Sequence, residues 1–311
     1  MSRIVCAGAA GIDRLYRAQD ALQPATSNPA ALSVRHGGVA RNIAETLARL
    51  GHDVALLSIV GDDPAGAELI AKLNGAGVQT RYVSRSSRQR TAEYAAILSL
   101  DGELELGAAD VSILDEFGDA EVAGAHDALA AADVIFAECN LPGSALITLL
   151  GVAFAFGRRF AVDAVSIAKA RRLPQQLDGV ALLFANSDEA AALAELSSSA
   201  TPEETSRVLR ERGAGAVVIG LGSSGTLIHD DSGVRRRDAV PPKALVDVTG
   251  AGDALIAGTI GAIAEGAGLD DAVHSGMLLA SLTVECEGSV RQDLDRALLE
   301  GERTRSAIGA R

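Results

Sequence analysis

The stretch 247–253, Asp-Val-Thr-Gly-Ala-Gly-Asp, combines a carboxylate with small residues just before an apolar run. Gly250, Ala251 and Gly252 leave backbone N–H groups accessible where we expect a helix to begin. The start of a helix attracts anions, because its first N–H groups are unpaired and its dipole is positive there. Asp253, at that positive end, is expected to stay ionised and to accept a proton from a bound hydroxyl. This combination suits phosphoryl transfer to an alcohol; a glycine turn with an Asp cap is the structural alternative.

A second glycine-rich stretch, 36–42, precedes another predicted helix. Apolar residues at 39, 43, 47 and 50 share one helical face, and Gly51 is a suitable helix end. The glycine pair, including Gly38, allows the backbone to approach a ligand closely. Asn42, one turn into the helix, can hydrogen-bond hydroxyl groups. Capping explains one glycine but not the whole set, so we expect Gly38 and Asn42 to bind substrate.

Composition limits the classes of function. The chain has 311 residues, of which 48% are apolar, enough for one large α/β domain or two small ones. Its net charge of −13 repels polyanions, so we expect no nucleic-acid polymer as a partner. No apolar run approaches the roughly 20 residues of a membrane helix, and the N-terminus resembles a first strand rather than a signal peptide. Three scattered cysteines favour a reducing, cytoplasmic location over a disulfide framework.

Two common nucleotide-binding motifs are missing from the sequence. None of the three lysines follows a glycine, so the chain lacks a Walker-type phosphate loop. No Gly-x-Gly-x-x-Gly follows the first predicted strand, which excludes a Rossmann dehydrogenase. Any nucleotide must therefore bind to another cradle. Lys169 either approaches a phosphate or is a solvated helix lysine, and we favour the second interpretation.

Strands and helices alternate along most of the chain. This alternation predicts a doubly wound, mostly parallel α/β sheet with helices on both faces. The predicted strands are 3–7, 54–60, 134–138, 160–163, 182–185 and 216–221. Carboxyl ends of parallel strands meet at one edge of the sheet, where ligands bind. The residues expected at that edge are Asp13, Asn140, Asp163, Asn186 and Gly222.

Two segments, about 14–36 and 78–108, interrupt the α/β pattern. The second contains an alternating apolar and polar run from Thr91, typical of a half-exposed sheet. We therefore expect a single domain over 1–311 with a small β-sheet lid made from these two segments. A lid with an apolar outer face often mediates dimerisation, so we also expect a homodimer.

In these stretches the chain resembles the ribokinase-like, or PfkB, carbohydrate kinases. The resemblance covers about residues 3–300, and stretches 37–42 and 247–253 match the two signatures of that family. It implies that Asp253 is the catalytic base and that Gly250, Ala251 and Gly252 form the anion hole. It implies ATP and Mg²⁺ as cofactors, with K⁺ as a further candidate. The implied ATP-binding residues are Asn186, Gly220, Gly222, Gly225, Thr249, Gly250 and Gly252.

The resemblance also implies metal sites. Asn186 and Glu189 match an Asn-x-x-Glu element that organises Mg²⁺, through water molecules. Asp247 and Thr249 stand where many members hold a monovalent cation.

Within the family, the details are most similar to the members that phosphorylate the 5′-hydroxyl of pseudouridine. The stretches 27–29, 37–44, 138–140, 163–166 and 285–287 carry this similarity. Two details depart from it: Ala164 stands where Pro is expected, and Phe184-Ala185 where Lys-Pro is usual. The implied substrate-binding residues are Asp13, Asn28, Gly38, Asn42, Thr91, Tyr94, Asn140 and Asp253. Thr91, Tyr94 and Asn140 are the candidates for contacts with the uracil base.

Two other functions stay open at this point. One is a kinase of the same family that acts on another nucleoside or a free sugar, such as adenosine, ribose or fructose. The other is a catalytically idle nucleoside-binding protein on the same fold. The complete set of Asp253, the Gly-Ala-Gly turn and the Asn186/Glu189 pair favours an enzyme, because an idle site has no need for all of them.

Overall fold

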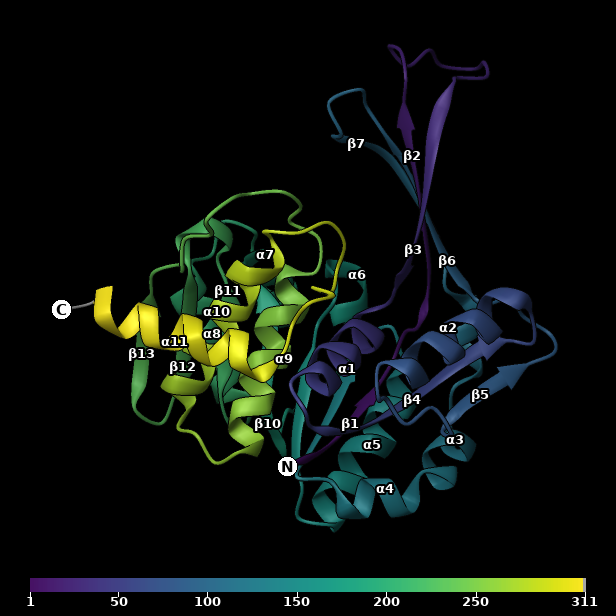
Figure 1. Cartoon of the computed structure of the whole chain (residues 1–311). Coiled ribbons are helices and arrows are strands. Elements are labelled where there is room, and N and C mark those ends of the chain that lie inside the picture. The colour runs from purple at the N-terminus through teal and green to yellow at the C-terminus, as the bar shows by residue number, and fades with distance from the viewer. Residues whose placement is uncertain (310–311) are drawn as a thin grey trace.

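The computed structural model describes residues 1–309 and contains a nine-stranded, mostly parallel sheet with helices on both faces. A separate four-stranded sheet rises from one side of this body (Figure 1). The predicted fold class is thus confirmed. None of the described helices is long and apolar enough to cross a membrane.

The large sheet has the strand order β13-β12-β11-β10-β9-β8-β1-β4-β5, and every neighbouring pair from β11 to β5 is parallel. The seven parallel strands are β1 (Arg3–Ala7), β4 (Asp53–Gly61), β5 (Val83–Ser86), β8 (Val134–Glu138), β9 (Arg159–Asp163), β10 (Val180–Asn186) and β11 (Val217–Gly220). The other edge is an antiparallel hairpin, β12 (Thr226–Asp230) and β13 (Gly233–Arg237), which the sequence analysis did not predict.

Each face of this sheet has its own apolar core, because side chains alternate along a strand. In β1, Ile4 and Cys6 belong to one core, whereas Val5 and Ala7 belong to the other. The helices on the Ile4 side are α1 (Val39–Arg49), α2 (Pro64–Gly75), α9 (Ala251–Ala264) and α10 (Leu269–Thr283). Those on the Val5 side are α3 (Asp119–Gly124), α4 (His126–Ala131), α5 (Gly143–Ala155), α6 (Ile167–Ala170), α7 (Ser187–Ala194) and α8 (Pro202–Glu211). The remaining elements are α11 (Arg296–Gly309) and the 3₁₀ turns 112–116 and 222–224.

The small sheet forms the lid, with the order β3-β2-β6-β7. Its strands are β2 (Gly11–Ala18), β3 (Ala30–Gly37), β6 (Ala92–Leu98) and β7 (Leu104–Asp110). The predicted boundaries need two corrections. The lid begins at Gly11 rather than near residue 14, and β5 belongs to the large sheet, because it pairs in parallel with the free edge of β4.

Candidate active site

The anion-binding feature predicted at 250–252 is the open start of α9. Gly250 caps this helix with φ 78°, and a Cβ there would overlap the Ser289 carbonyl oxygen, so the position requires glycine. A Cβ on Gly252 would meet nothing within 4 Å, so space is open in front of the first turn. The Ala251 N–H donates to the Val248 carbonyl at 3.3 Å, and the other N–H groups at the start of this turn are accessible to an anion such as a phosphate.

Asp253 is held by a chain of side chains from α1. The Asn42 Nδ2 donates to Asp253 Oδ2 at 2.7 Å, and Arg41 Nη1 donates to Asn42 Oδ1 at 2.7 Å. Because a guanidinium can only donate, Arg41 fixes the Asn42 amide with its nitrogen toward Asp253. Arg41 itself is buried and paired with the buried Glu45. The sequence analysis assigned Arg41 and Glu45 no role, although their i,i+4 spacing allows a pair on one helix face.

The protonation state of Asp253 differs from the sequence expectation. Burial raises its pKa to about 7, with a further rise from the charges of Glu138 and Asp13, although the Asn42 hydrogen bond lowers it. The sequence analysis expected Asp253 to stay ionised, whereas a group with this pKa is only partly ionised at neutral pH, because desolvation outweighs the favourable partners. A carboxylate with this pKa is well matched to general-base catalysis near neutral pH.

Asp13 lies on lid strand β2, which begins four residues after the end of β1. A Cβ on Gly37 would overlap its carboxylate, and its negative charge contributes to the raised pKa of Asp253. Gly38 has φ 102°, and a Cβ there would overlap the Ala9 carbonyl oxygen at the end of β1. The structure therefore brings Asp13 and the start of α1 to the side of the site where Asp253 lies.

A buried carboxylate missing from the sequence-based site, Glu138, lies at the carboxyl end of β8. It accepts hydrogen bonds from the backbone N–H of Ala9 and of Asn140, the latter at 2.6 Å, and burial raises its pKa. The sequence signal was available, since 134–138 is an apolar strand that ends in an acidic residue. Lys169 Nζ donates to the Asn140 side-chain oxygen, and burial lowers its pKa. Lys169 is thus not the solvated lysine that was expected.

The Asn186/Glu189 pair forms the cap of α7. Asn186 Oδ1 accepts from the Glu189 N–H and Glu189 Oε2 accepts from the Asn186 N–H, both at 2.9 Å. Burial, with the charges of Glu189 and Asp253, raises the pKa of Asp163 well above its ordinary value. This concentration of negative charge would be relieved by a bound cation. Within residues 1–309 no three His, Cys, Asp or Glu side chains are placed to hold one metal ion, so Mg²⁺ would keep several waters, as it commonly does.

Two of the residues predicted to bind ATP, Asn186 and Gly220, line an open cavity of about 450 Å³ at the ends of β10 and β11. It is lined by Asn186, Gly220, Leu221 and Ser224, among others, and its size is suitable for a small ligand. The structure therefore brings together Asn186, Gly220 and the turn over 222–225. Position 225 also requires glycine for a structural reason, because a Cβ there would overlap the Arg237 carbonyl oxygen.

Three predicted substrate contacts are placed less directly. Tyr94 shares a row of the lid with Asp13, and its hydroxyl occupies the space next to Gly107. The Thr91 hydroxyl donates to Asp63 and accepts from the Gly61 N–H, so its main bonds hold the start of β6. Asn28 hydrogen-bonds within its own loop. That loop joins β2 to β3 at the end of the lid farthest from the body (Figure 1), so Asn28 is not brought to Asp253.

Asp247 and Thr249, the predicted cation ligands, lie next to an arginine. The Asp247 carboxylate accepts from the N–H groups of Thr249 and Gly288, each at 3.0 Å, and from Arg35 Nη1 at 2.7 Å. Although burial opposes the change, these hydrogen bonds lower the pKa of Asp247 to about 2.

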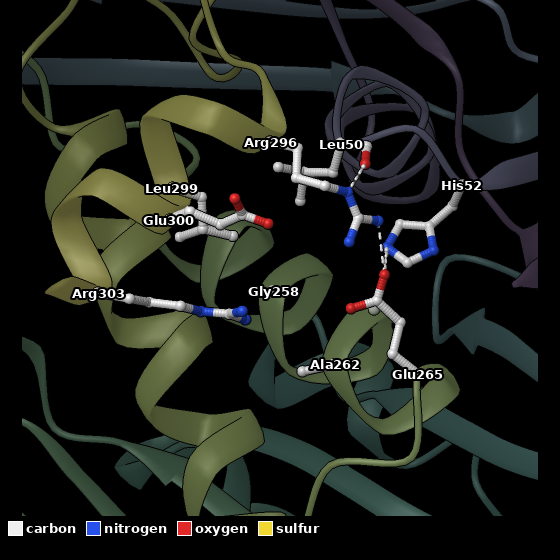
Figure 2. A pocket seen from close by; sticks show the side chains of 10 residues that line it. Leu50, His52, Gly258, Ala262, Glu265, Arg296, Leu299, Glu300 and Arg303 are labelled. Atoms are coloured by element: carbon white, nitrogen blue, oxygen red, sulfur yellow. Dashed lines mark hydrogen bonds and ion pairs between the residues drawn. The ribbon is translucent and has the colours of Figure 1, made fainter. Parts of the chain in front are cut away.

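A small cavity elsewhere is separate from this site (Figure 2). It has a volume of about 20 Å³ and is lined by His52, Glu265 and Arg296, among others. Glu265, the cap of α9, follows Asp253 by twelve residues. At the rise of an α-helix this places the cavity about 18 Å from Asp253 along the helix axis. The buried His52 Nδ1 has no hydrogen-bond partner in the described part of the chain. The cavity is large enough for about one water molecule, which would provide that partner.

Comparisons with known proteins show the family of the chain. The model of the family described as pfkB family carbohydrate kinase matches residues 1–295. A pseudouridine kinase of Escherichia coli is 30% identical over 297 residues, which cover 94% of each chain. An uncharacterised sugar kinase of the same organism is also 30% identical, over 83% of this chain and 71% of its own. The structure of Arabidopsis thaliana ribokinase complexed with ribose and ATP has a TM-score of 0.85 and 22% identity, covering 96% of this chain and 98% of its own.

Proposed function

Because the chain belongs to the pfkB family of carbohydrate kinases, we propose that it transfers a phosphoryl group from ATP to the 5′-hydroxyl of pseudouridine. The transfer step is supported above all by one observation, the Asn42–Asp253 hydrogen bond of 2.7 Å beside the open start of α9. The choice of pseudouridine is supported by the pseudouridine kinase relative, which matches over nearly the whole chain.

In this proposal Asp253 is the general base. Asn42 holds one carboxylate oxygen of Asp253, and the substrate hydroxyl approaches the carboxylate and gives up its proton. The freed oxygen bonds to the γ-phosphorus as the bond to the ADP oxygen breaks. The N–H groups of Gly250 and Gly252, together with that of Ala251, which also donates to the Val248 carbonyl, stabilise the negative charge on the transferring group. Asp13, Gly38 and Asn42 hold the ribose so that its 5′-hydroxyl faces Asp253.

The cavity at the ends of β10 and β11 would hold the nucleotide. Its predicted contacts are Asn186, Gly220, Gly222, Gly225 and Thr249. Mg²⁺, when bound, would neutralise phosphate charge, and Asn186 and Glu189 would contact it through waters. Both side chains lie at the start of α7, where their capping bonds hold them in place.

Two residues are the main candidates for recognition of the base. Tyr94 offers an aromatic ring on the lid face that also carries Asp13, and Asn140 lies at the end of β8 beside Lys169. The contributions of Thr91 and Asn28 are weaker, because their polar groups already form the bonds described above. Pseudouridine has a glycosidic C–C bond, so its base carries one more ring N–H than that of uridine. A side-chain oxygen such as that of Asn140 can accept a hydrogen bond from this N–H.

The test is ATP consumption, with the product mass measured, for pseudouridine, uridine, cytidine, adenosine, ribose and fructose. We expect the highest kcat/KM for pseudouridine and a gain of one phosphoryl group at the 5′ position. The second candidate, a free-sugar kinase, is favoured by the sugar kinase relative. It predicts that ribose or fructose is used at least as well as any nucleoside, which would overturn the choice of pseudouridine. An absence of turnover together with nucleoside binding would instead favour the idle-protein alternative.

We also propose that two copies associate through the lid. Its outer face exposes Leu32, Val34, Ile97 and Leu106, with exposed fractions of 50%, 53%, 36% and 61%. The strand register places these four side chains on one face of the sheet, opposite Asp13. An apolar patch of this kind on an exposed sheet is typical of an interface. A cytoplasmic location, expected from the cysteine content, remains a prediction.

A further inference from the structure

One ion pair links the lid to the stretch before the anion hole. Arg35, on lid strand β3, donates from Nη1 to Asp247 Oδ2 at 2.7 Å, and its Nη2 lies 3.3 Å from Glu287 Oε2. Asp247 is the first residue of the glycine-rich signature, 212 positions after Arg35. Both side chains are largely shielded from water, with exposed fractions of 26% for Arg35 and 19% for Asp247. This is therefore a partly buried pair with close geometry rather than a solvated surface contact.

The Asp247 carboxylate connects three separate segments through its hydrogen bonds. One oxygen accepts from the Thr249 N–H, and the other accepts from both the Gly288 N–H and Arg35. The segment after Gly288 also contacts the anion-hole turn, because Gly250 packs directly against the Ser289 carbonyl. Asp247 thus fixes the backbone that leads into Gly250, and the guanidinium balances the negative charge of this anchor.

The residues present do not fit the monovalent cation that the family resemblance implies at Asp247 and Thr249. The positively charged guanidinium of Arg35 already lies 2.7 Å from Asp247 Oδ2, and the Gly288 N–H donates to the same oxygen at 3.0 Å. A second cation on the same carboxylate would be repelled by the guanidinium at short range. The disagreement depends on the arginine at position 35.

We propose that Arg35 takes the place of the monovalent cation, so that the lid itself supplies the charge that orders the turn over 247–250. This inference rests on the proposed kinase activity. Arg35 and Asp13 are direct partners on neighbouring lid strands and share one face of the sheet. The strand pair that presents Asp13 to the substrate therefore also presents Arg35 to Asp247. Arg35 is a positioning residue, because it acts on the anion hole through Asp247 and not on the reacting atoms.

The first experiment compares K⁺ with choline, at equal ionic strength, in thermal unfolding and in turnover. For the wild-type protein we expect the unfolding midpoint to change by less than about 1 °C and kcat to change less than about twofold, since no cation site is available. For Arg35→Ala we expect kcat in choline to fall at least about tenfold. K⁺ should then restore part of kcat and raise the unfolding midpoint saturably, because the vacated carboxylate can bind it. Arg35→Lys keeps the charge and should lose less activity than Arg35→Ala.

Arg14→Ala is the matched control. It also removes a lid arginine from an ion pair, with Glu93 at 2.9 Å, but that pair lies within the lid sheet. We expect it to stay insensitive to K⁺.

Two outcomes would overturn the inference: saturable stabilisation of the wild-type protein by K⁺, or wild-type kcat in Arg35→Ala without added K⁺. Thermal unfolding of the wild-type protein requires no turnover, so it tests the role of Arg35 even if the substrate proposal fails. If Arg35→Ala does not fold, the wild-type unfolding measurement and the activity of Arg35→Lys still test the inference.

Discussion

Asp247 and Asp253 lie at the two ends of one seven-residue stretch, yet their environments are opposite. Asp247 meets a guanidinium and two backbone N–H groups, and its pKa falls to about 2. Asp253 is half-buried near other carboxylates, and its hydrogen-bond partner among the described residues is the neutral Asn42 amide, so its pKa rises to about 7. The same residue type therefore serves as a permanently charged anchor at one end and as a proton acceptor at the other. Such divergence between neighbouring carboxyl groups is typical of acid–base sites.

The largest expected effect comes from removing the proton acceptor. Asp253→Asn should lower kcat by about 10³-fold, because the amide keeps the shape of the side chain but cannot take the hydroxyl proton. Nucleoside and ATP binding, measured by calorimetry, should change little. Wild-type turnover in this variant would remove Asp253 from the role of base.

A smaller effect is expected in the pH dependence of kcat/KM, which distinguishes Asp253 from Asp247. The kcat/KM of the wild-type protein should rise with pH and level off above an apparent pKa of about 7, since Asp253 must be ionised to act and Asp247 is ionised throughout this range. Asn42→Ala removes the hydrogen bond that lowers the pKa of Asp253, so the rise should move to higher pH. Its kcat/KM at pH 7 should fall about tenfold. If kcat/KM does not change with pH between pH 5 and 9, the assignment of Asp253 as the base is contradicted.

The same comparison predicts an effect on stability. The folded-state pKa of Asp253 is raised above its unfolded value of 3.8, so its contribution is complete below about pH 4 and is lost as the pH rises through 7. Asp253→Asn does not lose this contribution, because its side chain does not titrate. We expect its free energy of unfolding to exceed that of the wild type by about 2 kcal/mol at pH 8, a value that allows for solvent screening, and by little at pH 4. Urea titrations at both pH values measure the difference, and an equal difference at both would contradict it.

The smallest effect on activity is expected at the lid surface. Val34→Lys, on the outer apolar face, should convert a dimer to a monomer in sedimentation equilibrium while changing kcat less than about threefold. Leu100→Glu is the matched control, because Leu100 is 58% exposed but lies outside the lid strands. A wild-type protein that is monomeric at high concentration would remove the lid dimer from consideration.

Local patterns were enough to predict the architecture and the glycine turn. Strand and helix alternation, the Gly-Ala-Gly start of α9 and the helix from Val39 are encoded in neighbouring residues, so they could be recognised without coordinates. The short β5 was misassigned to the lid, because its partner β4 lies more than 20 residues earlier and only pairing identifies its sheet.

The electrostatics of the site could not be predicted in the same way. The pKa of Asp253 depends on burial and on Glu138, which is 115 positions away in the chain. The orientation of Asn42 depends on Arg41, a charge that a helical pattern places at the surface but that the fold buries against Glu45. The Arg35–Asp247 pair likewise joins segments with no relation in sequence.

The three-residue connection between β1 and β2 has a consequence for motion. Within it, the Ala9 N–H bonds to Glu138 and the Ala9 carbonyl accepts from the Arg41 N–H at 3.1 Å, while the Gly8 N–H bonds to Leu57 at 3.0 Å. The lid therefore leaves the body through backbone that is fixed to the core on both sides. Any swing of the lid must come from twisting of its strands beyond Gly11. In amide hydrogen exchange, Ala9 should be protected like the central strands, whereas protection should decrease along β2 and β3 toward their shared loop.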